Sequence, residues 1–344
     1  SNPKEMYSFS KAESKDSILY HYLPSIRIPV LSQIIQLIYS FIYTIYWCFK
    51  TKGEKIIFCD IFAICSSKGA TAAARLFNIR KCAMITDMIS TPITTAYNTS
   101  KIWWKLFFKL RRKYQTKILK QYDLFVYLTK YMNEVYNPSQ KPYIIMEGSV
   151  DVNFTPNQGI KKDNRRIIMY AGSIEAEYGF KELVEAFTSL TIPNIELHIY
   201  GNGKFVSSLI EYQKKDTRIR YMGIVSNEEI LHAEQRATLM VNPRLSHQEF
   251  TKYSFPSKTS EYMLSGTPLL TTKLPGIPEE YMPFIYTFDE ESVQGFANTM
   301  HKILSYSDKE LQDKGQQAQQ FVLSNKNNYI QSKRIIDFII SHRS

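Results

Sequence analysis

Short apolar runs alternate with amphipathic segments through the carboxyl-terminal half of the chain. Strand-like runs cover 166–170, 195–200, 219–222, 239–242 and 269–272. Between the first two, 182–190 has helical spacing, with Leu183, Phe187 and Leu190 along one side. Strands that alternate with helices predict a parallel sheet covered on both faces. Gly172, Gly201 and Gly223 follow three of the strands, at the sheet edge where such folds bind ligands.

The amino-terminal half repeats this rhythm with fewer glycines. Strand-like runs cover 55–59, 82–85, 124–128 and 143–146, and 70–77 has a helical pattern. A length of 344 residues suits two domains. We expect a first α/β domain over 1–150, whose first strands are either absent or unusual, a hinge over 151–164 and a second domain over 165–325. A helix over 326–344 is expected to return to the first domain.

One short segment, 255–268, carries the clearest chemical signal. Ser257 has the side chain of a helix N-cap, and Gly266 suits the left-handed residue that ends a helix. Lys258 and Glu261 lie three residues apart and share one face of the first turn. That turn offers free N–H groups and a cation to phosphate, and a carboxylate to sugar hydroxyls. A nucleotide-sugar has both groups, although a surface helix with an incidental ion pair has the same spacing.

This half resembles the donor domain of retaining glycosyltransferases, the glycosyl transferases group 1 (family 4) that build bacterial surface polysaccharides. The resemblance is carried by four segments: 170–173 (Tyr-Ala-Gly-Ser), 178–180 (Tyr-Gly-Phe), 242–244 (Asn-Pro-Arg) and 255–268. It implies the GT-B fold, an α/β architecture of two Rossmann-like, doubly wound parallel-sheet domains facing a central cleft.

The resemblance also implies roles for individual residues. Glu261 would bind the nucleotide ribose, Lys258 would neutralise the leaving diphosphate, and the loop with Val225 would meet the base. The full expected donor site is Gly172, Ser173, Gly201, Val225, Arg244, Lys252, Ser257, Lys258 and Glu261.

The chain departs from the family pattern at two points. The family has a glutamate eight positions before the one at Glu261, and this chain has Tyr253 there. We expect the acidic role to pass to Glu249 or to be lost. Ser173 and Tyr178 stand where the family has basic residues, so Lys252 or Arg244 is expected to assist Lys258.

On the acceptor side, Asp87 ends a predicted strand where the family presents a polar residue to the reacting sugar. A carboxylate there would orient or deprotonate the acceptor hydroxyl, although a structural or helix-capping aspartate fits the same position. The expected catalytic residues are therefore Asp87, Lys258 and Glu249. The resemblance implies no metal and no cofactor beyond the nucleotide-sugar co-substrate, and no His cluster or Asp-x-Asp pair suggests a metal site.

Charge is concentrated in the first domain. Residues 1–150 hold 21 Lys and Arg against 9 Asp and Glu, a net charge of +12, whereas the whole chain has +11. A basic and aromatic stretch begins at Lys101 and ends at Lys120, with no acidic residue. Such a stretch is typical of a helix at an anionic membrane surface, although its aromatic residues would also suit the domain core.

A second apolar segment begins at Ile28 and ends at Phe49, uncharged between Arg27 and Lys50. Its 22 residues are long enough to span a bilayer. Several Ser, Thr, Gln and Tyr residues interrupt it, which favours a buried or interfacial helix. All three placements remain open from the sequence.

Taken together, these features predict a retaining, metal-independent glycosyltransferase of the hexosyltransferase type. It would move a sugar from a UDP-sugar to a polyprenyl-diphosphate-linked acceptor in capsule or exopolysaccharide synthesis, in the cytoplasm and peripheral on the inner face of the cell membrane. The four cysteines are expected to be reduced. A nucleotide-sugar epimerase and a non-catalytic GT-B partner protein remain alternatives. A pI near 9.2 permits nucleic-acid binding, but no recognised nucleic-acid motif is present.

Overall fold

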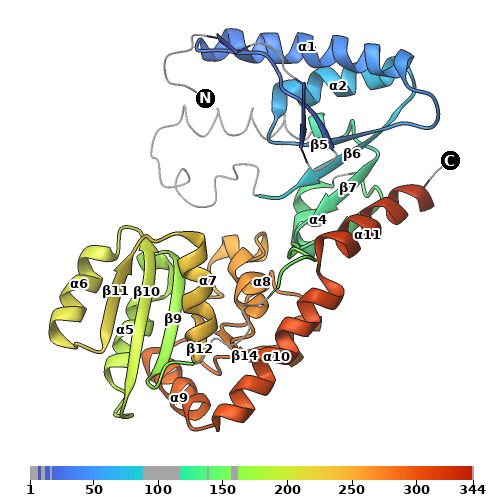
Figure 1. Cartoon of the computed structure of the whole chain (residues 1–344). Helices are drawn as coiled ribbons and strands as arrows, with labels where there is room; N and C mark the ends of the chain where they lie inside the picture. Colours follow the sequence, from blue (N-terminus) through green and yellow to red (C-terminus); the bar gives the residue numbers. More distant parts are fainter. Residues whose placement is uncertain are drawn as a thin grey trace. The chain divides into compact units, whose positions relative to one another are not determined.

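The computed structural model describes residues 7–8, 12–15, 18–87, 117–137, 139–155 and 162–342 (Figure 1). The chain divides into two compact units, one of residues 1–145 and 342–344 and one of residues 146–341. The division falls upstream of the stretch 151–164 that was expected to be the hinge. The basic stretch beginning at Lys101 lies outside the described residues, apart from its last four, 117–120.

The first unit is built on a four-stranded parallel sheet with the strand order β5-β6-β7-β8. These strands are β5 (Ile56–Asp60), β6 (Arg80–Ile85), β7 (Leu124–Tyr127) and β8 (Tyr143–Ile145). Its described helices are α1 (Pro29–Lys50), α2 (Ile64–Leu76) and α4 (Lys130–Tyr136). Two antiparallel pairs precede α1: β1 (Tyr7–Ser8) with β4 (Ser25–Ile26), and β2 (Ala12–Lys15) with β3 (Ile18–His21).

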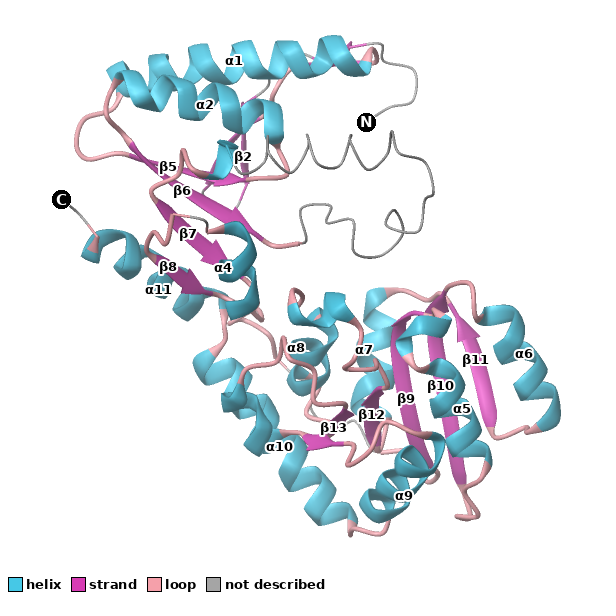
Figure 2. Cartoon of the chain, turned by 180° about the vertical axis from the view of Figure 1, so that it is seen from behind, coloured by secondary structure: helices cyan, strands magenta, loops and turns pink. Residues whose placement is uncertain are grey.

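Helices α1 and α2 run side by side, as Figures 1 and 2 both show. Gly69 of α2 lies directly against α1, because a Cβ built on it would lie 2.1 Å from Ser40 Oγ and 2.2 Å from the Leu37 carbonyl oxygen. Among the α1 residues whose burial the structure describes, the buried ones are Ser32, Ser40 and Thr44. Small and polar side chains therefore fill the contact between the two helices.

The second unit contains a six-stranded, entirely parallel sheet with the order β11-β10-β9-β12-β13-β14. Its strands are β9 (Arg166–Ser173), β10 (Ile195–Asn202), β11 (Ile219–Gly223), β12 (Leu239–Asn242), β13 (Leu269–Thr271) and β14 (Tyr286–Thr287). Five of these match the predicted strands to within three residues. The reversal of strand order between β9 and β12 marks the topological switch point of a doubly wound sheet.

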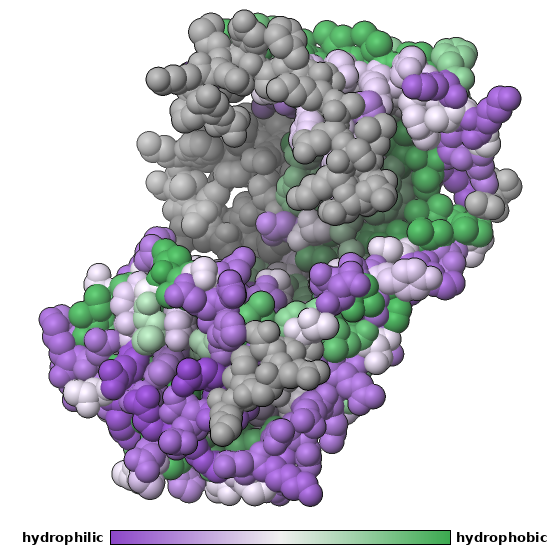
Figure 3. All heavy atoms as spheres, viewed as in Figure 1, coloured by the Kyte–Doolittle hydropathy of each residue, from purple (hydrophilic) through white to green (hydrophobic). Residues whose placement is uncertain are grey.

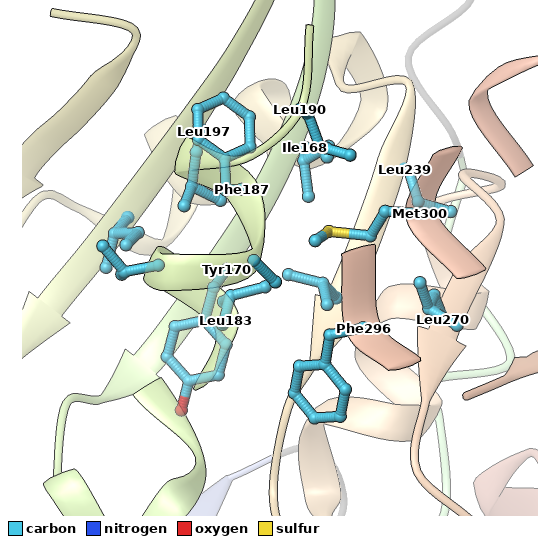
Figure 4. Close-up of a cluster of buried hydrophobic side chains, with 14 of the residues drawn as sticks. Ile168, Tyr170, Leu183, Phe187, Leu190, Leu197, Leu239, Leu270, Phe296 and Met300 are labelled. Carbon is cyan, nitrogen blue, oxygen red and sulfur yellow. The ribbon is translucent and has the colours of Figure 1, made fainter. Parts of the chain in front are cut away.

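Helices cover both faces of this sheet (Figure 2). Successive side chains of a strand point to opposite faces, so each face carries apolar residues that pack against helices in a core of their own. On β9, Ile168 and Tyr170 join one buried cluster, and Ile167 and Met169 join the other. Figure 4 shows the first cluster, where Phe187 and Phe296 come from helices on the same face.

The helices of the first cluster are α5 (Phe180–Thr188), α6 (Val206–Lys215) and α9 (Val293–Leu304), and Leu311 near the start of the later helix α10 (Asp308–Asn325) joins them. Those of the second are α7 (Asn227–Arg236), α8 (Ser257–Leu264) and α10. Three 3-10 helices, η1 (Ala176–Tyr178), η2 (Glu249–Lys252) and η3 (Glu279–Phe284), lie in the connections, and α11 (Asn328–Ser341) follows α10.

A buried ion pair joins the two ends of the second unit. Lys326 Nζ lies 2.5 Å from Glu147 Oε1 and 2.6 Å from Glu280 Oε1, and the side chains of Lys326 and Glu147 are almost fully buried. Tyr281 donates a hydrogen bond of 3.0 Å to Glu147. The Gln331 amide donates to the Gly148 carbonyl. The beginning of the unit is thus fastened to the α10–α11 junction.

Candidate active site

The carboxyl ends of β9 and β10 approach each other so closely that they admit no side chain. Gly201 has a φ of 126°, and a Cβ built on it would lie 1.8 Å from the Gly172 carbonyl oxygen. Tyr170 stabilises the same turn by donating a hydrogen bond of 2.9 Å to the Ser173 carbonyl. Glycine is therefore required at position 201, and backbone is exposed at the sheet edge where doubly wound folds bind ligands.

Helix α8 is fixed to this edge by a buried tyrosine. Tyr262 Oη accepts a hydrogen bond from the Ala171 N–H and donates one to the Ala171 carbonyl, both at 2.8 Å. Gly266, with a φ of 76°, ends the helix as predicted. The N-cap prediction was wrong: Pro256 occupies the N-cap position, Ser257 is the first helical residue, and no side chain caps the helix. Because proline has no side-chain acceptor, the first N–H groups of α8 are left without a side-chain cap.

Lys258 and Glu261 share one face of α8, as their spacing predicts. Lys258 Nζ lies 2.5 Å from Glu261 Oε2, and the two side chains are 33% and 49% exposed. An exposed pair of this kind contributes little stability, so both groups are available to a ligand at small cost. The ammonium suits phosphate oxygens, and the carboxylate suits a pair of hydroxyls.

A third ionisable group near this pair was not predicted. Glu234, on α7, is 1% exposed, and its Oε1 has no hydrogen-bond partner among the described residues. Burial raises the pKa of this carboxyl from 4.5 to about 7; the positive charge of Lys258 lowers it and the negative charge of Glu261 raises it. A carboxyl that titrates near neutrality therefore interacts with the charges of the candidate donor site.

The position of Glu234 follows from how α7 is held. Ser226 and Glu229 form a capping box that fixes the start of the helix. Near its end, Thr267 Oγ1 donates a hydrogen bond of 2.7 Å to the Glu234 carbonyl. Glu234 lies four residues after Ile230 and is therefore on the buried side of α7. The sequence signal that could have identified Glu234 is its position among the apolar residues on one side of a helix, where a charged side chain is unusual.

The segments 178–180 and 242–244 meet in the folded chain. Gly179 has a φ of 75°, and a Cβ built on it would lie 2.1 Å from the Pro243 carbonyl oxygen. The Arg244 guanidinium lies 4.4 Å from the ring centroid of Tyr178 and 5.6 Å from that of Phe250. The buried Arg244 Nε has no hydrogen-bond partner in the described part of the chain. The structure thus places this predicted cation on an aromatic surface, with one donor unused.

Glu249, the predicted replacement for the missing glutamate, lies in η2. Lys252 Nζ is 3.4 Å from Glu249 Oε2, and Tyr253 Oη is 3.3 Å from Glu249 Oε1. The tyrosine at the family's glutamate position therefore contacts the proposed substitute carboxylate.

The other predicted residues lie at the end of a strand or in loops. Ser173 is exposed at the end of β9, and Val225 is half-buried in the loop between β11 and α7. Asp87 is exposed just after β6, in the first unit, whereas the other site residues belong to the second. Over the described residues, no group of three or more His, Cys, Asp or Glu side chains could hold a metal ion.

Comparison with known proteins identifies the family of the domain that contains the site. Residues 151–321 match the profile of the glycosyl transferases group 1 family. The chain is similar to the sucrose-phosphate synthase of Thermosynechococcus elongatus, at 14% identity and a TM-score of 0.67 over 99% of this chain and 86% of that one. It is also similar to the Anabaena protein Alr3699/HepE, solved with UDP and glucose, at 12% identity and a TM-score of 0.58 over 88% and 81%.

A third solved structure, the lipopolysaccharide outer core galactosyltransferase WaaB, matches at 13% identity and a TM-score of 0.60 over 92% of this chain and 82% of that one. A search of curated proteins found no match. The segment 151–321 is a group 1 glycosyltransferase domain, and the chain has the GT-B fold. The protein is therefore a glycosyltransferase, which confirms the predicted resemblance, fold class and enzyme class.

Proposed function

We propose that this glycosyltransferase moves a sugar from UDP-sugar to a lipid-linked acceptor, with retention at the anomeric carbon and without a metal ion. The observation that carries the donor side is the Lys258–Glu261 pair on the first turn of α8, beside the glycine turn of β9 and β10. UDP is the favoured nucleotide because Alr3699/HepE, a protein of the same fold, was solved with UDP and glucose.

In this proposal the reaction breaks the bond between the anomeric carbon and the diphosphate oxygen, and forms a bond to the acceptor hydroxyl oxygen. The acceptor proton goes to the departing diphosphate. Lys258 and the free N–H groups at the start of α8 stabilise the charge that develops on this leaving group. Glu261 holds the ribose, Arg244 and Lys252 add positive charge, Glu249 supplies the second acidic group, and Asp87 orients the acceptor hydroxyl.

The acceptor is proposed to be a polyprenyl-diphosphate-linked glycan, in capsule or exopolysaccharide synthesis on the cytoplasmic face of a bacterial membrane. The support is the net charge of +12 in residues 1–150, which suits an anionic lipid surface. One described helix, from Val30 to Lys50, is long and apolar enough to cross a membrane.

The donor site is tested by calorimetric titration of UDP, GDP and ADP into the wild-type chain and into Lys258→Ala. We expect UDP to bind and the substitution to weaken binding by about tenfold or more, the loss typical of a charge-assisted contact to phosphate. Lys214→Ala is the matched control, because Lys214 forms the same kind of exposed pair with Glu211 on α6, at 2.7 Å. Failure of all three nucleotides to bind the folded chain would leave the non-catalytic partner protein as the better proposal.

A further inference from the structure

Helix α1 exposes its large apolar side chains. The residues Val30, Ile34, Ile38, Ile42, Tyr46 and Phe49 recur every three or four positions and so share one side of the helix, here called the outer face of α1. Their exposed fractions run from 49% for Ile34 to 77% for Phe49. Figure 3 shows hydrophobic side chains gathered along the top of the view, where α1 lies. A water-facing helix normally has the opposite arrangement.

The opposite side of α1, which contacts α2, is lined by small and polar residues. Ser40 and Thr44 are buried there, and the Leu37 carbonyl oxygen and the Ser40 hydroxyl oxygen meet Gly69 without space for a methyl group. Close contact through glycine and serine is typical of helix pairs within lipid, where the apolar side chains face outward. The pattern indicates that the outer face of α1 is buried in an apolar environment when the protein functions.

The charges around α1 favour a lipid surface as its occupant. No charged residue occurs on α1 before Lys50, and Arg27 precedes the helix. Lys52, Glu54 and Lys55 follow it, so the charge at each end of α1 is still net positive. Lys50 Nζ lies 5.3 Å from the ring centroid of Tyr46, so a cation and an aromatic ring stand together at the end of the helix. This combination suits anionic headgroups, whereas a second copy of the chain would place like charges against each other.

The position of α2 determines the orientation of α1 in the bilayer. Because α2 lies along one side of α1 and carries Lys68 and Arg75, a spanning α1 would draw charged side chains into hydrocarbon. We propose that α1 lies in the plane of an anionic bilayer, with its outer face at the boundary between headgroups and acyl chains. This inference deepens the membrane part of the proposed function and does not depend on the donor site.

Binding is tested by flotation of the full chain with vesicles of phosphatidylcholine and phosphatidylglycerol. We expect the double variant Ile34→Asp and Ile42→Asp to lose about tenfold or more in vesicle affinity, since two aliphatic side chains no longer enter the apolar layer. Ile210→Asp, at an exposed isoleucine of α6, is the matched control and should bind like the wild type. Unchanged binding of the double variant would overturn the proposal, as would self-association of the wild type that the double variant abolishes.

The in-plane orientation of α1 is tested separately by measuring how deeply two labelled positions lie in the bilayer. A nitrobenzoxadiazole label is placed on Ile34→Cys or Ile42→Cys in a background of Cys48→Ser and Cys65→Ser. The remaining Cys59 and Cys82 are buried. Quenching by lipids that carry spin labels at shallow or deep acyl positions should report one common, shallow depth for both sites. A deep site paired with a shallow one would show that α1 spans the bilayer instead.

Calorimetric titration of UDP into the double variant separates this inference from the proposed function. The α1 substitutions should leave UDP binding unchanged, because α1 and the donor residues lie in different units. Lost vesicle binding with intact UDP binding supports the membrane face. Vesicle binding that survives the substitutions overturns it, whatever the result with nucleotide.

Discussion

Replacing Glu234 with glutamine should stabilise the protein progressively as the pH rises. The carboxyl is 1% exposed, and burial raises its pKa from 4.5 to about 7. Between these values the folded chain holds a proton that the unfolded chain has lost. The free energy of unfolding therefore falls as the pH rises from about 4.5 to about 7. Below about pH 4.5 the carboxyl is protonated in both states, and the cost of burying its charge disappears.

The size of the effect follows from the shift. A change of about 2.5 pKa units at about 1.4 kcal/mol per unit gives a penalty of about 3 kcal/mol above pH 7. Glutamine has nearly the same shape but cannot ionise, so the Glu234→Gln variant avoids this penalty. The free energy of unfolding of the variant should exceed that of the wild type by about 3 kcal/mol near pH 8, and the difference should shrink towards pH 5.

Urea unfolding followed by circular dichroism at several pH values measures this difference. Glu228→Gln is the matched control, since Glu228 is exposed on the same helix, and its curve should run parallel to that of the wild type. A constant difference between Glu234→Gln and wild type from pH 5 to pH 8.5 would refute the reasoning. So would a variant that becomes less stable than wild type as the pH rises, because that would mean the ionised carboxylate is the favoured form.

Two further substitutions test packing in each unit by the same unfolding measurement. Gly69→Ala should cost about 1–3 kcal/mol, because its methyl group would lie 2.1 Å from Ser40 Oγ; a neutral result would mean that the contact between α1 and α2 is loose. Glu147→Ala should cost about 3 kcal/mol, since among the described residues it leaves the buried Lys326 with only the exposed Glu280 as a carboxylate partner. A loss below about 1 kcal/mol would show that Lys326 is not buried as described.

The strand order and the donor helix could be predicted because local signals agree with the fold at these places. The apolar runs that became β9 and β10 are flanked by glycines whose positive φ the close turn requires. The residues Lys258 and Glu261 lie on one helix, so their spacing alone brings them together. The error at Ser257 has a simple cause: Pro256 itself occupies the N-cap position, so Ser257 is the first helical residue and no side chain caps the helix.

Other features depend on contacts between distant segments, which sequence patterns do not reveal. Glu234 approaches Lys258 only because α7 and α8 cover the same face of the sheet. The outward direction of the apolar residues on α1 depends on Gly69, which selects the polar side of the helix as the contact. The composition of 28–49 allowed a buried, interfacial or spanning helix, and the structure shows that it is not buried in the core.

The fastening between the beginning of the second unit and the α10–α11 junction has a consequence for protein synthesis. Gln331 and Gly148 are joined by a hydrogen bond although they are 183 residues apart in the sequence. Glu147 and Lys326, which form the ion pair, have a similar separation in the sequence. During translation the carboxylate of Glu147 therefore emerges from the ribosome long before its partner exists. Because chains elongate at about 5–20 residues per second, this carboxylate stays in water for roughly ten seconds or more. The second unit can complete this contact only after Lys326 has left the ribosome, and a chain truncated before Lys326 would leave the Glu147 carboxylate without its buried ammonium partner.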